Sequence, residues 1–161
     1  MLNNAILELL ENDAKMSAEQ IASSLGMKVE DVSAAIEEFE DKDIIAGYKT
    51  LIDWEKVGDD GVTALIEIKV VPQHGLGFER IAERMSQYSE VESVYLMSGA
   101  YDIAVTVSGK SLREVACFVS EKIAPLEYVT STATHFVLKK FKDKGVMYTN
   151  TQKGQERGCA F

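Results

Sequence analysis

A short segment of the chain, Ser98-Gly99-Ala100-Tyr101-Asp102, places backbone N–H groups, a phenol and a carboxylate within five residues. A free amino acid carries a carboxylate and an ammonium group at a fixed separation. Backbone N–H groups suit the carboxylate of such a ligand, and Asp102 suits its ammonium group. A tight turn between antiparallel strands is also a sufficient structural reason for Gly99. The residues alone therefore leave both a ligand site and a plain turn open.

The sequence offers no catalytic pattern beside this segment. It contains no HExxH motif and no nucleophile elbow. Gly109-Lys110-Ser111 is similar to the end of a phosphate-binding loop, but Ala104 stands where such a loop needs its first glycine. A tight strand-to-helix turn that Ser111 caps explains this segment better. We therefore expect a protein that is not an enzyme.

Cysteine and histidine are too sparse to indicate a metal site. Cys117 and Cys159 form no CxxC pair, and neither His74 nor His135 stands at metal-ligand spacing from them. We expect His74 in an exposed loop, His135 on a sheet surface or at a subunit contact, and Cys117 in the core. No metal and no cofactor is predicted.

Net charge is distributed unevenly along the chain. The total is −9, yet residues 1–60 hold 5 Lys and no Arg against 15 Asp and Glu, a net of −10. Residues 61–161 hold 12 Lys and Arg against 11 Asp and Glu, a net of +1. The sequence shows neither the roughly 20 apolar residues of a membrane helix nor a signal peptide at its start. Two scattered thiols fit a reducing compartment, so we expect a cytoplasmic protein that binds no membrane.

Three short helices are predicted before residue 42. The first carries apolar residues at helical spacing, and the second begins at Ser17 with Gln20 three residues later, which is a capping-box pattern. Gly26 ends the second helix, and a third follows with Val32 and Phe39 on its apolar side. This order is typical of a helix-turn-helix, whose last helix enters the DNA major groove. Residues 44–52 predict a strand, and residues 53–61 a linker.

The second half alternates strands with amphipathic helices in the order βαββαβ, which is typical of a ferredoxin-like α+β domain. Such a sheet carries both helices on one face. We expect Leu65, Val105 or its neighbours, Phe136 and Leu138 on the other face, where a second subunit would cover them. The predicted strands are 63–71, 91–97, 101–108 and 129–141, and the predicted helical faces are Phe78, Ile81, Ala82, Met85, Tyr88 and Leu112, Val115, Ala116, Val119, Ile123.

The whole chain resembles the leucine-responsive regulatory protein/AsnC, or feast-famine, family of transcriptional regulators. The helix-turn-helix, the connector 53–58, the turn 98–102 and the closing strand 131–139 carry this resemblance by their order and spacing. It implies a winged-type helix-turn-helix DNA-binding domain in residues 1–52 and a linker in 53–61. It further implies a ligand-binding and oligomerisation domain, called RAM, in residues 62–142, and a C-terminal tail in 143–161.

The resemblance also implies partners and site residues. RAM domains pair into dimers, which assemble further, commonly into octamers, and a small amino acid binds between dimers. The residues that correspond to the family's ligand site, and those that we expect to contact DNA, fall into two groups. Ligand-binding residues are Ser98, Gly99, Tyr101, Asp102, Thr132 and Thr134, and DNA-contacting residues are Lys28, Ser33, Ala34, Lys42 and Lys49. The family usually has Thr in place of Ser98 and Asp or His in place of Ala100, so the effector's identity stays open.

The third helix departs from the family pattern because its outer face is acidic or small rather than basic. DNA affinity comes largely from neutralising phosphates with Lys and Arg, and an unpaired carboxylate near a phosphate repels it. The architecture nevertheless leads us to expect an amino-acid-responsive transcriptional regulator that binds DNA as an oligomer. The alternative is an amino-acid sensor or adaptor of the same fold with weak or lost direct DNA binding.

Overall fold

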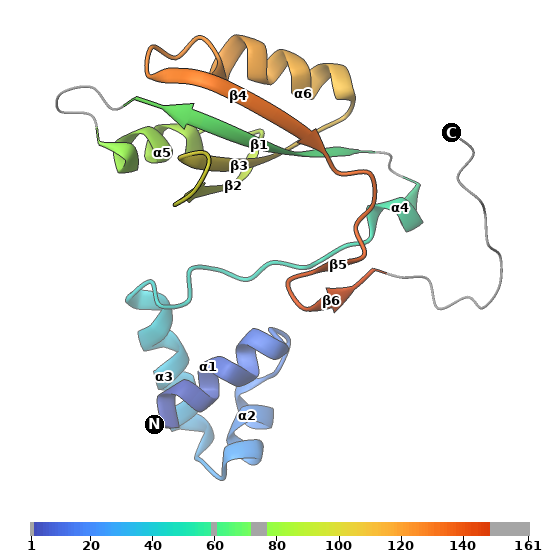
Figure 1. Ribbon diagram of the computed structural model, residues 1–161. Coiled ribbons are helices and arrows are strands. Elements are labelled where there is room, and N and C mark those ends of the chain that lie inside the picture. The colour runs from blue at the N-terminus through green and yellow to red at the C-terminus, as the bar shows by residue number, and fades with distance from the viewer. Residues whose placement is uncertain (1, 59–60, 72–76, 149–161) are drawn as a thin grey trace. The chain divides into compact units, whose positions relative to one another are not determined.

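The computed structural model describes residues 2–58, 61–71 and 77–148 (Figure 1). The chain divides into two compact units, Met1–Leu51 and Ile52–Phe161. His74 and Cys159, for which we made predictions, lie outside the described residues. Within the described part of the chain, no helix is both long and apolar enough to cross a membrane.

The N-terminal unit consists of three helices, α1 (Leu2–Asn12), α2 (Ala18–Leu25) and α3 (Val29–Asp41). The predicted capping box is confirmed: Ser17 accepts a hydrogen bond from the backbone of Gln20, whose side chain accepts one from the backbone N–H of Ser17. Gly26 ends α2 in the left-handed region with φ of 65°. The core residues that hold the three helices together are Ile6, Leu10, Ile21, Ala22, Val32 and Phe39.

The segment between the units departs from the sequence prediction. Residues 44–52 are described, but they form no strand, so the predicted strand is wrong for the single chain. A strand is defined by hydrogen bonds to a neighbouring strand, and this segment has none. Within the predicted linker, α4 (Trp54–Val57) forms one helical turn, which Gly58 ends with φ of 83°.

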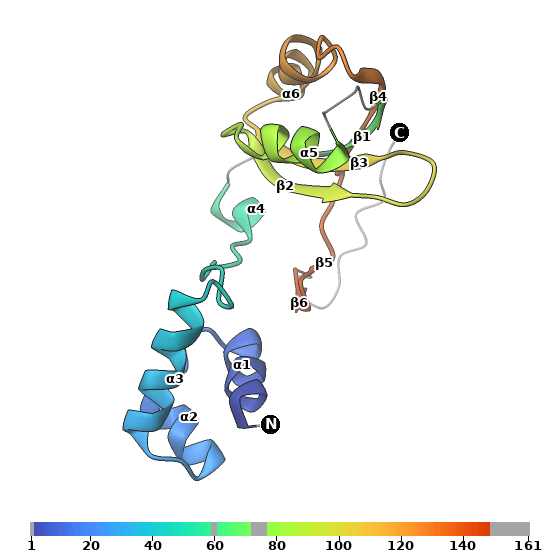
Figure 2. The same ribbon diagram turned by 90° about the vertical axis from the view of Figure 1, so that its left-hand side faces the viewer.

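The C-terminal unit is built on a four-stranded antiparallel sheet in the order β2-β3-β1-β4. Its strands are β1 (Val62–Val70), β2 (Val91–Leu96), β3 (Ile103–Gly109) and β4 (Val129–Phe136). Helix α5 (Phe78–Ser86) connects β1 to β2, and α6 (Leu112–Phe118) with the π-helical turn η1 (Val119–Ile123) connects β3 to β4 (Figures 1 and 2). The predicted βαββαβ order is therefore confirmed.

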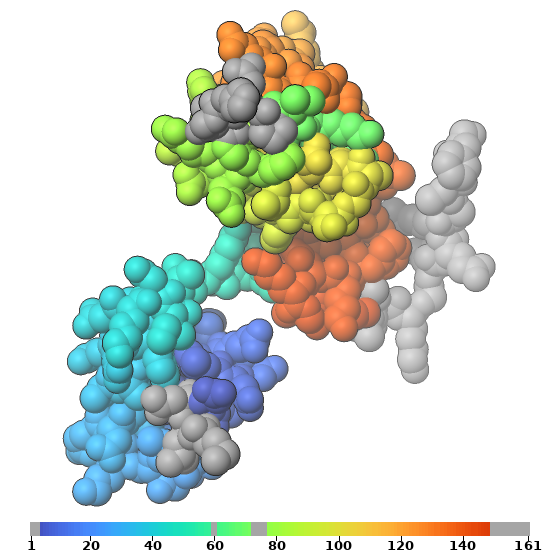
Figure 3. All heavy atoms as spheres, turned by 60° about the vertical axis from the view of Figure 1, so that its left-hand side comes forward, coloured from blue at the N-terminus to red at the C-terminus, as the bar shows by residue number. Residues whose placement is uncertain are grey.

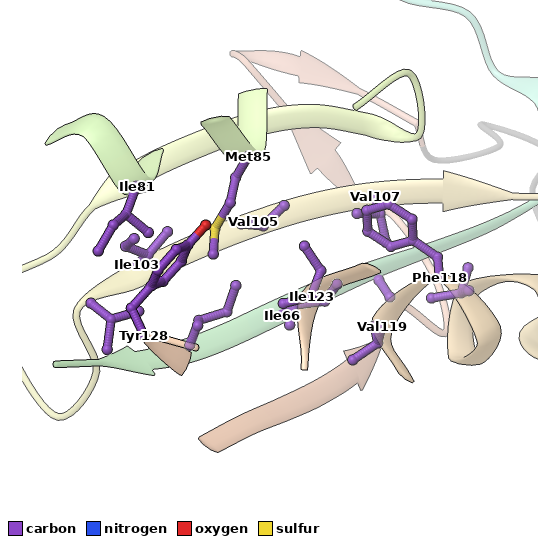
Figure 4. Packing of buried hydrophobic residues seen from close by; sticks show 14 residues of the cluster. Ile66, Ile81, Met85, Ile103, Val105, Val107, Phe118, Val119, Ile123 and Tyr128 are labelled. Atoms are coloured by element: carbon purple, nitrogen blue, oxygen red, sulfur yellow. The ribbon is translucent and has the colours of Figure 1, made fainter. Parts of the chain in front are cut away.

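One apolar core lies between this sheet and both helices. Ile66, Ile103 and Val105 of the sheet belong to the same buried cluster as Ile81 of α5 and Phe118 of α6 (Figure 4). Both helices therefore cover one face of the sheet, as predicted. The whole cluster comprises Ala64, Ile66, Ile68, Val70, Ile81, Met85, Ile103, Val105, Val107, Val115, Phe118, Val119, Ile123 and Tyr128.

The buried side of α6 differs from the predicted one at Leu112, Ala116 and Cys117, which are all exposed. The helix turns its buried face along Val115, Phe118 and Val119, and Cys117 lies about 200° around the helix from Val115. The expected core position of Cys117 is therefore wrong.

The open face of the sheet is not the apolar surface that the sequence predicted. Val105 is fully buried on the helix side, and Phe136 pairs with Ala64 and packs against the same core. Leu138 lies beyond the end of β4 and is 94% exposed. Leu65 lies on the open face as expected. The expectation is wrong for Val105 and Phe136, because the register of β3 and β4 turns both towards the helices. The residues that alternate onto the open face are Thr63, Leu65, Glu67, Lys69, Ser93, Tyr95, Ala104, Thr106, Ser108, Ser131, Ala133 and His135.

The last strand is also shorter than predicted. β4 ends at Phe136, although residues 129–141 were expected to be extended in the sheet. The chain then forms a small two-stranded hairpin, β5 (Lys142–Asp143) and β6 (Val146–Met147). The residues between its strands, Lys144 and Gly145, both have positive φ, 44° and 84°, which is typical of a two-residue type I′ turn.

Candidate functional site

The exposed face of α3, the helix expected to enter the DNA groove, is acidic. Ala34 lies on the side opposite the buried Val32 and is exposed, whereas Ser33 is half-buried. Helical spacing of three and four residues surrounds Ala34 with carboxylates. These exposed neighbours are Glu30, Asp31, Glu37 and Glu38, and Asp41 lies one further turn along the same side of the helix.

The predicted DNA-contacting lysines lie at the ends of this helix and beyond it. Lys28 is the N-cap residue of α3 and Lys42 its C-cap residue, so the thirteen residues of α3 separate them by about 20 Å. Lys49 is exposed in the extended segment that follows. The three lysines therefore do not form one basic patch on α3.

Lys42 is moreover engaged within the chain. Its ammonium group lies 2.5 Å from a carboxylate oxygen of Glu38, one helical turn earlier. The hydrogen bond from Lys42 lowers the pKa of Glu38, which is therefore ionised at neutral pH. A phosphate would compete with Glu38 for this lysine.

The acidic surface extends to the segment after α3. The Tyr48 hydroxyl donates a hydrogen bond of 2.9 Å to Glu40. Desolvation, and then this bond to Glu40, raises the pKa of Tyr48, so the phenol stays neutral. The two predicted DNA-contacting residues that lie within α3, Ser33 and Ala34, carry no charge to offset these carboxylates.

Figure 2 shows the turn that joins β2 to β3. Ser98, Gly99 and Ala100 of this turn are exposed, and Tyr101 and Asp102 are half-buried. Asp102 is held at three points. Its N–H donates to the carbonyl of Ile68, its carbonyl accepts from Met97, and its Oδ2 accepts from the backbone N–H of Val70 at 2.9 Å. The exposed half of the turn therefore stands on a fixed base.

The carboxylate of Asp102 supports an irregularity in β1. The pairing of β1 with β4 shifts register between Lys69 and Val70. At that shift the Val70 N–H donates to Asp102, and the Lys69 carbonyl accepts from the Thr130 hydroxyl at 3.1 Å. The sequence predicted Asp102 only as a ligand-binding residue. Its hydrogen bond with the backbone of Val70 was not predicted, because no local pattern in the sequence marks it.

Gly99 is not required by the fold of the single chain. Its φ does not lie in the left-handed region, and no described heavy atom outside the adjoining residues lies within 4 Å of where a Cβ would be. A turn alone, which sequence reasoning considered a sufficient cause for Gly99, does not explain it here. The position leaves room for another molecule to approach the backbone closely.

The two threonines predicted for the ligand site lie apart from the turn in this chain. Thr132 and Thr134 are half-buried on β4 and pair with Ile68 and Ile66, so both face the helix side of the sheet. Ile103, which directly follows the turn, pairs with Ile68 on the other side of β1. Two strand spacings, about 10 Å, therefore separate the Thr132 backbone from the base of the turn.

Comparison with known proteins agrees with both units. Residues 3–46 match the family model described as winged helix-turn-helix DNA-binding, and residues 63–147 match the Lrp/AsnC ligand binding domain. An uncharacterised HTH-type transcriptional regulator of Bacillus subtilis, YugG, is 46% identical over 144 residues, which are 89% of this chain and 87% of the relative.

Two solved structures share the fold. Escherichia coli AsnC is 23% identical with a TM-score of 0.66, and the match covers 92% of this chain and 95% of AsnC. A transcriptional regulator of Neisseria meningitidis in complex with L-Met is 19% identical with a TM-score of 0.68, covering 88% and 92%. From its two domain matches and its identity to YugG, the chain belongs to the Lrp/AsnC family of helix-turn-helix transcriptional regulators, which have a ligand-binding domain and are not enzymes.

Proposed function

We propose that this regulator binds DNA as an oligomer through its helix-turn-helix and senses a small amino acid at an interface between RAM domains. The observation that carries the sensing part is the turn 98–102, whose exposed backbone stands on a base fixed by Asp102. Preformed N–H groups lose little conformational entropy when they bind a carboxylate.

The state of Gly99 supports a ligand or partner at this turn. Neither backbone strain nor crowding within the described chain accounts for a glycine there. A small amino acid that lays its carboxylate against the turn would account for it, because a side chain at position 99 would stand between the ligand and the backbone.

Asp102 keeps one carboxylate oxygen for a ligand. Oδ2 accepts from Val70, while Oδ1 has no hydrogen-bond partner among the described residues. One oxygen can therefore hold the base of the turn while the other accepts from an ammonium group. Asp102 thus serves both the fold and the ligand in this proposal.

A second subunit would complete the site. Two hollows on the described surface lie away from the turn, one beside Asp13 and Gln20 in the N-terminal unit and one between β3 and α6. Ser98 to Ala100 are open to solvent, and the exposed Leu96 and Met97 adjoin them. Apolar side chains next to exposed polar backbone suit a subunit contact around a small ligand. The Neisseria meningitidis regulator, whose structure contains L-Met, supports an amino acid as the ligand class.

A thermal-shift screen of the twenty amino acids, followed by light scattering on each hit, tests this proposal. We expect one or a few small amino acids to raise the Tm and to change the molar mass of the protein. At a ligand concentration of 100 Kd, the free energy of unfolding should rise by about 2.7 kcal/mol. In the same screen, the variant Gly99→Val, whose side chain obstructs the turn, should show no rise in Tm with any amino acid. Stabilisation that survives in Gly99→Val, or no stabilisation by any amino acid, would contradict the proposed sensing.

A further inference from the structure

We propose that residues 139–148, here called the lysine hairpin, form a second DNA-contacting element that binds the phosphate backbone of duplex DNA. This inference rests on the proposed DNA binding of the chain. It assigns to the hairpin the positive charge that the exposed face of α3 lacks.

The charge of the lysine hairpin is opposite to that of the rest of the chain before it. Residues 139–144 hold four Lys and one Asp, a net of +3 within six residues. Residues 1–138 hold 11 Lys and Arg against 24 Asp and Glu, a net of −13. A polyanion that approaches this protein therefore finds a concentrated positive charge at the hairpin, whereas the chain before it repels the polyanion on balance.

The fold presents these lysines on a defined scaffold. The type I′ turn puts Lys144 at the tip, and the Tyr148 N–H donates to the Phe141 carbonyl at 2.9 Å, which closes the base of the hairpin. Lys140 lies 3.2 Å from Asp143 and 5.4 Å from the centre of the Tyr148 ring. Lys140 thus stabilises the hairpin itself.

Lys142 and Lys144 are the charges left for a partner. Neither has an ion pair among the described residues, whereas Lys140 pairs with Asp143. Lys139 lies over the ring of Phe141, 5.3 Å from its centre, a contact that leaves its ammonium group able to donate to a phosphate. Three lysines, at the base, on the strand and at the tip, can therefore contact successive phosphates.

The hairpin packs on neither core of its own chain. None of its residues belongs to the two buried clusters, and Phe141, Val146 and Met147 are 60%, 49% and 59% exposed. The segment lies at the surface in Figure 3, where it is orange to red. A two-stranded hairpin alone is marginally stable in water, so binding to a partner would stabilise it.

Duplex DNA fits these observations better than a protein partner does. It presents one negative charge per about 1.7 Å of helix axis, and its major groove admits a two-stranded ribbon. The competing partner is the acidic N-terminal unit, where residues 1–51 hold 4 Lys against 11 Asp and Glu, in this or a second copy. That charge is spread over a folded unit and is weaker per length than a phosphate backbone.

The test compares the full chain with the double variant Lys142→Gln, Lys144→Asn. Asparagine tolerates the left-handed φ of residue 144, so the turn is kept. The control Lys110→Gln, Arg113→Gln removes the same charge from exposed positions at the start of α6. Binding to a fluorescent 30-bp duplex is measured by anisotropy from 20 to 200 mM KCl, with the molar mass of each protein from light scattering.

We expect the hairpin variant to lose at least about ten-fold in affinity at 100 mM KCl, and the slope of log K against log salt to fall by about 1.8 for each protomer engaged. The control should stay within about two-fold of the unsubstituted chain, and every molar mass should be unchanged. This combined result would support the inference.

The contrary outcomes separate this inference from the proposed function. DNA binding by the unsubstituted chain with an unaltered affinity and slope in the hairpin variant would overturn the inference alone. Tighter DNA binding in the variant, or a fall in its mass, would also overturn it, since the lysines would then dock on the acidic unit or a second copy. No binding of any duplex by the unsubstituted chain would overturn both.

Discussion

The acidic face of α3 and the turn between β2 and β3 present opposite problems. Helix α3 has the position that a groove-binding helix needs, yet carboxylates surround Ala34 on its exposed side. The turn has groups that suit an amino acid, yet its described surroundings leave Ser98 to Ala100 open. In one region the fold is complete and the charge is unfavourable; in the other the chemistry is present and the enclosure is missing. Under the proposals above, a second copy of the chain would supply the missing enclosure at the turn, and the lysine hairpin would supply the positive charge that α3 lacks.

The largest expected effect is on the free energy of unfolding when Asp102, at the base of the turn, is substituted. Asp102→Ala leaves the backbone N–H of Val70 without its acceptor, so the free energy of unfolding should fall by about 1–3 kcal/mol. Asp102→Asn keeps an acceptor for the Val70 N–H, so its free energy of unfolding should fall by less than half as much. Because this variant lacks the negative charge, the effector should no longer stabilise it. Urea denaturation with and without the effector measures both. Equal stability of Asp102→Ala and the unsubstituted chain would show that the turn does not depend on this bond.

The second prediction concerns the affinity for DNA when the negative charge on the exposed side of α3 is reversed. Glu37→Lys with Asp41→Lys reverses two carboxylates on the side of α3 that carries Ala34, so affinity for non-specific duplex DNA should rise about ten-fold at low salt and its salt dependence should steepen. Anisotropy titration measures this. The matched control, Glu8→Lys with Glu11→Lys, makes the same change on exposed positions of α1. An equal gain in the control would mean that α3 has no special place on DNA.

The third prediction separates the ligand role of Gly99 from a folding role. The Cβ added by Gly99→Ala would contact no described atom, and residue 99 does not have a left-handed φ. The free energy of unfolding should therefore change by less than about 0.5 kcal/mol. Stabilisation by the effector should nevertheless weaken. A variant that unfolds early, with its effector response intact, would return Gly99 to a purely structural role.

The smallest expected effect compares an ion pair from each unit. Lys122 lies 2.5 Å from Glu90, and this hydrogen bond is the main cause that lowers the pKa of Glu90. Because the folded pKa lies below the ordinary value of 4.5, the pair stabilises the fold above that pH, and this contribution is lost as the pH falls through the folded pKa. Glu90→Gln should flatten acid destabilisation below pH 4.5 by about 0.5 kcal/mol, measured by urea denaturation. The more exposed pair Glu38–Lys42 should show no measurable change in the corresponding Glu38→Gln variant.

Local patterns predicted the elements well, because their causes are local. The Ser17–Gln20 capping box, Gly26 and the alternation of β1 are each set by residues a few positions apart, and the structure has all of them. The same patterns also gave the order of the domains, a helix-turn-helix followed by a βαββαβ unit, and the family resemblance agreed with it. The strand expected at 44–52 could not be judged this way, because a strand depends on a partner that sequence alone does not supply.

The surfaces were harder to predict, because they depend on register. A shift of one residue in pairing exchanges the two faces of a strand. Phe136, and Val105 or its neighbours, were therefore assigned to the open face, although Val105 is buried in the core and Phe136 packs against it. The bond from Val70 to Asp102 joins residues 32 positions apart, and no local pattern marks it. By contrast, the lysines of residues 139–144 can be read directly from the sequence. The hairpin that arranges them was not predicted.

The most direct test of the account is the affinity of the full chain for DNA from its own upstream region, with and without the amino acid that stabilises it. Coupling between the two sites predicts that the effector changes the Kd for this DNA by at least about five-fold, with a change in molar mass, and that Gly99→Val loses both responses. An affinity and mass that stay constant at saturating effector would contradict the claim that the turn senses an amino acid for a DNA-binding unit.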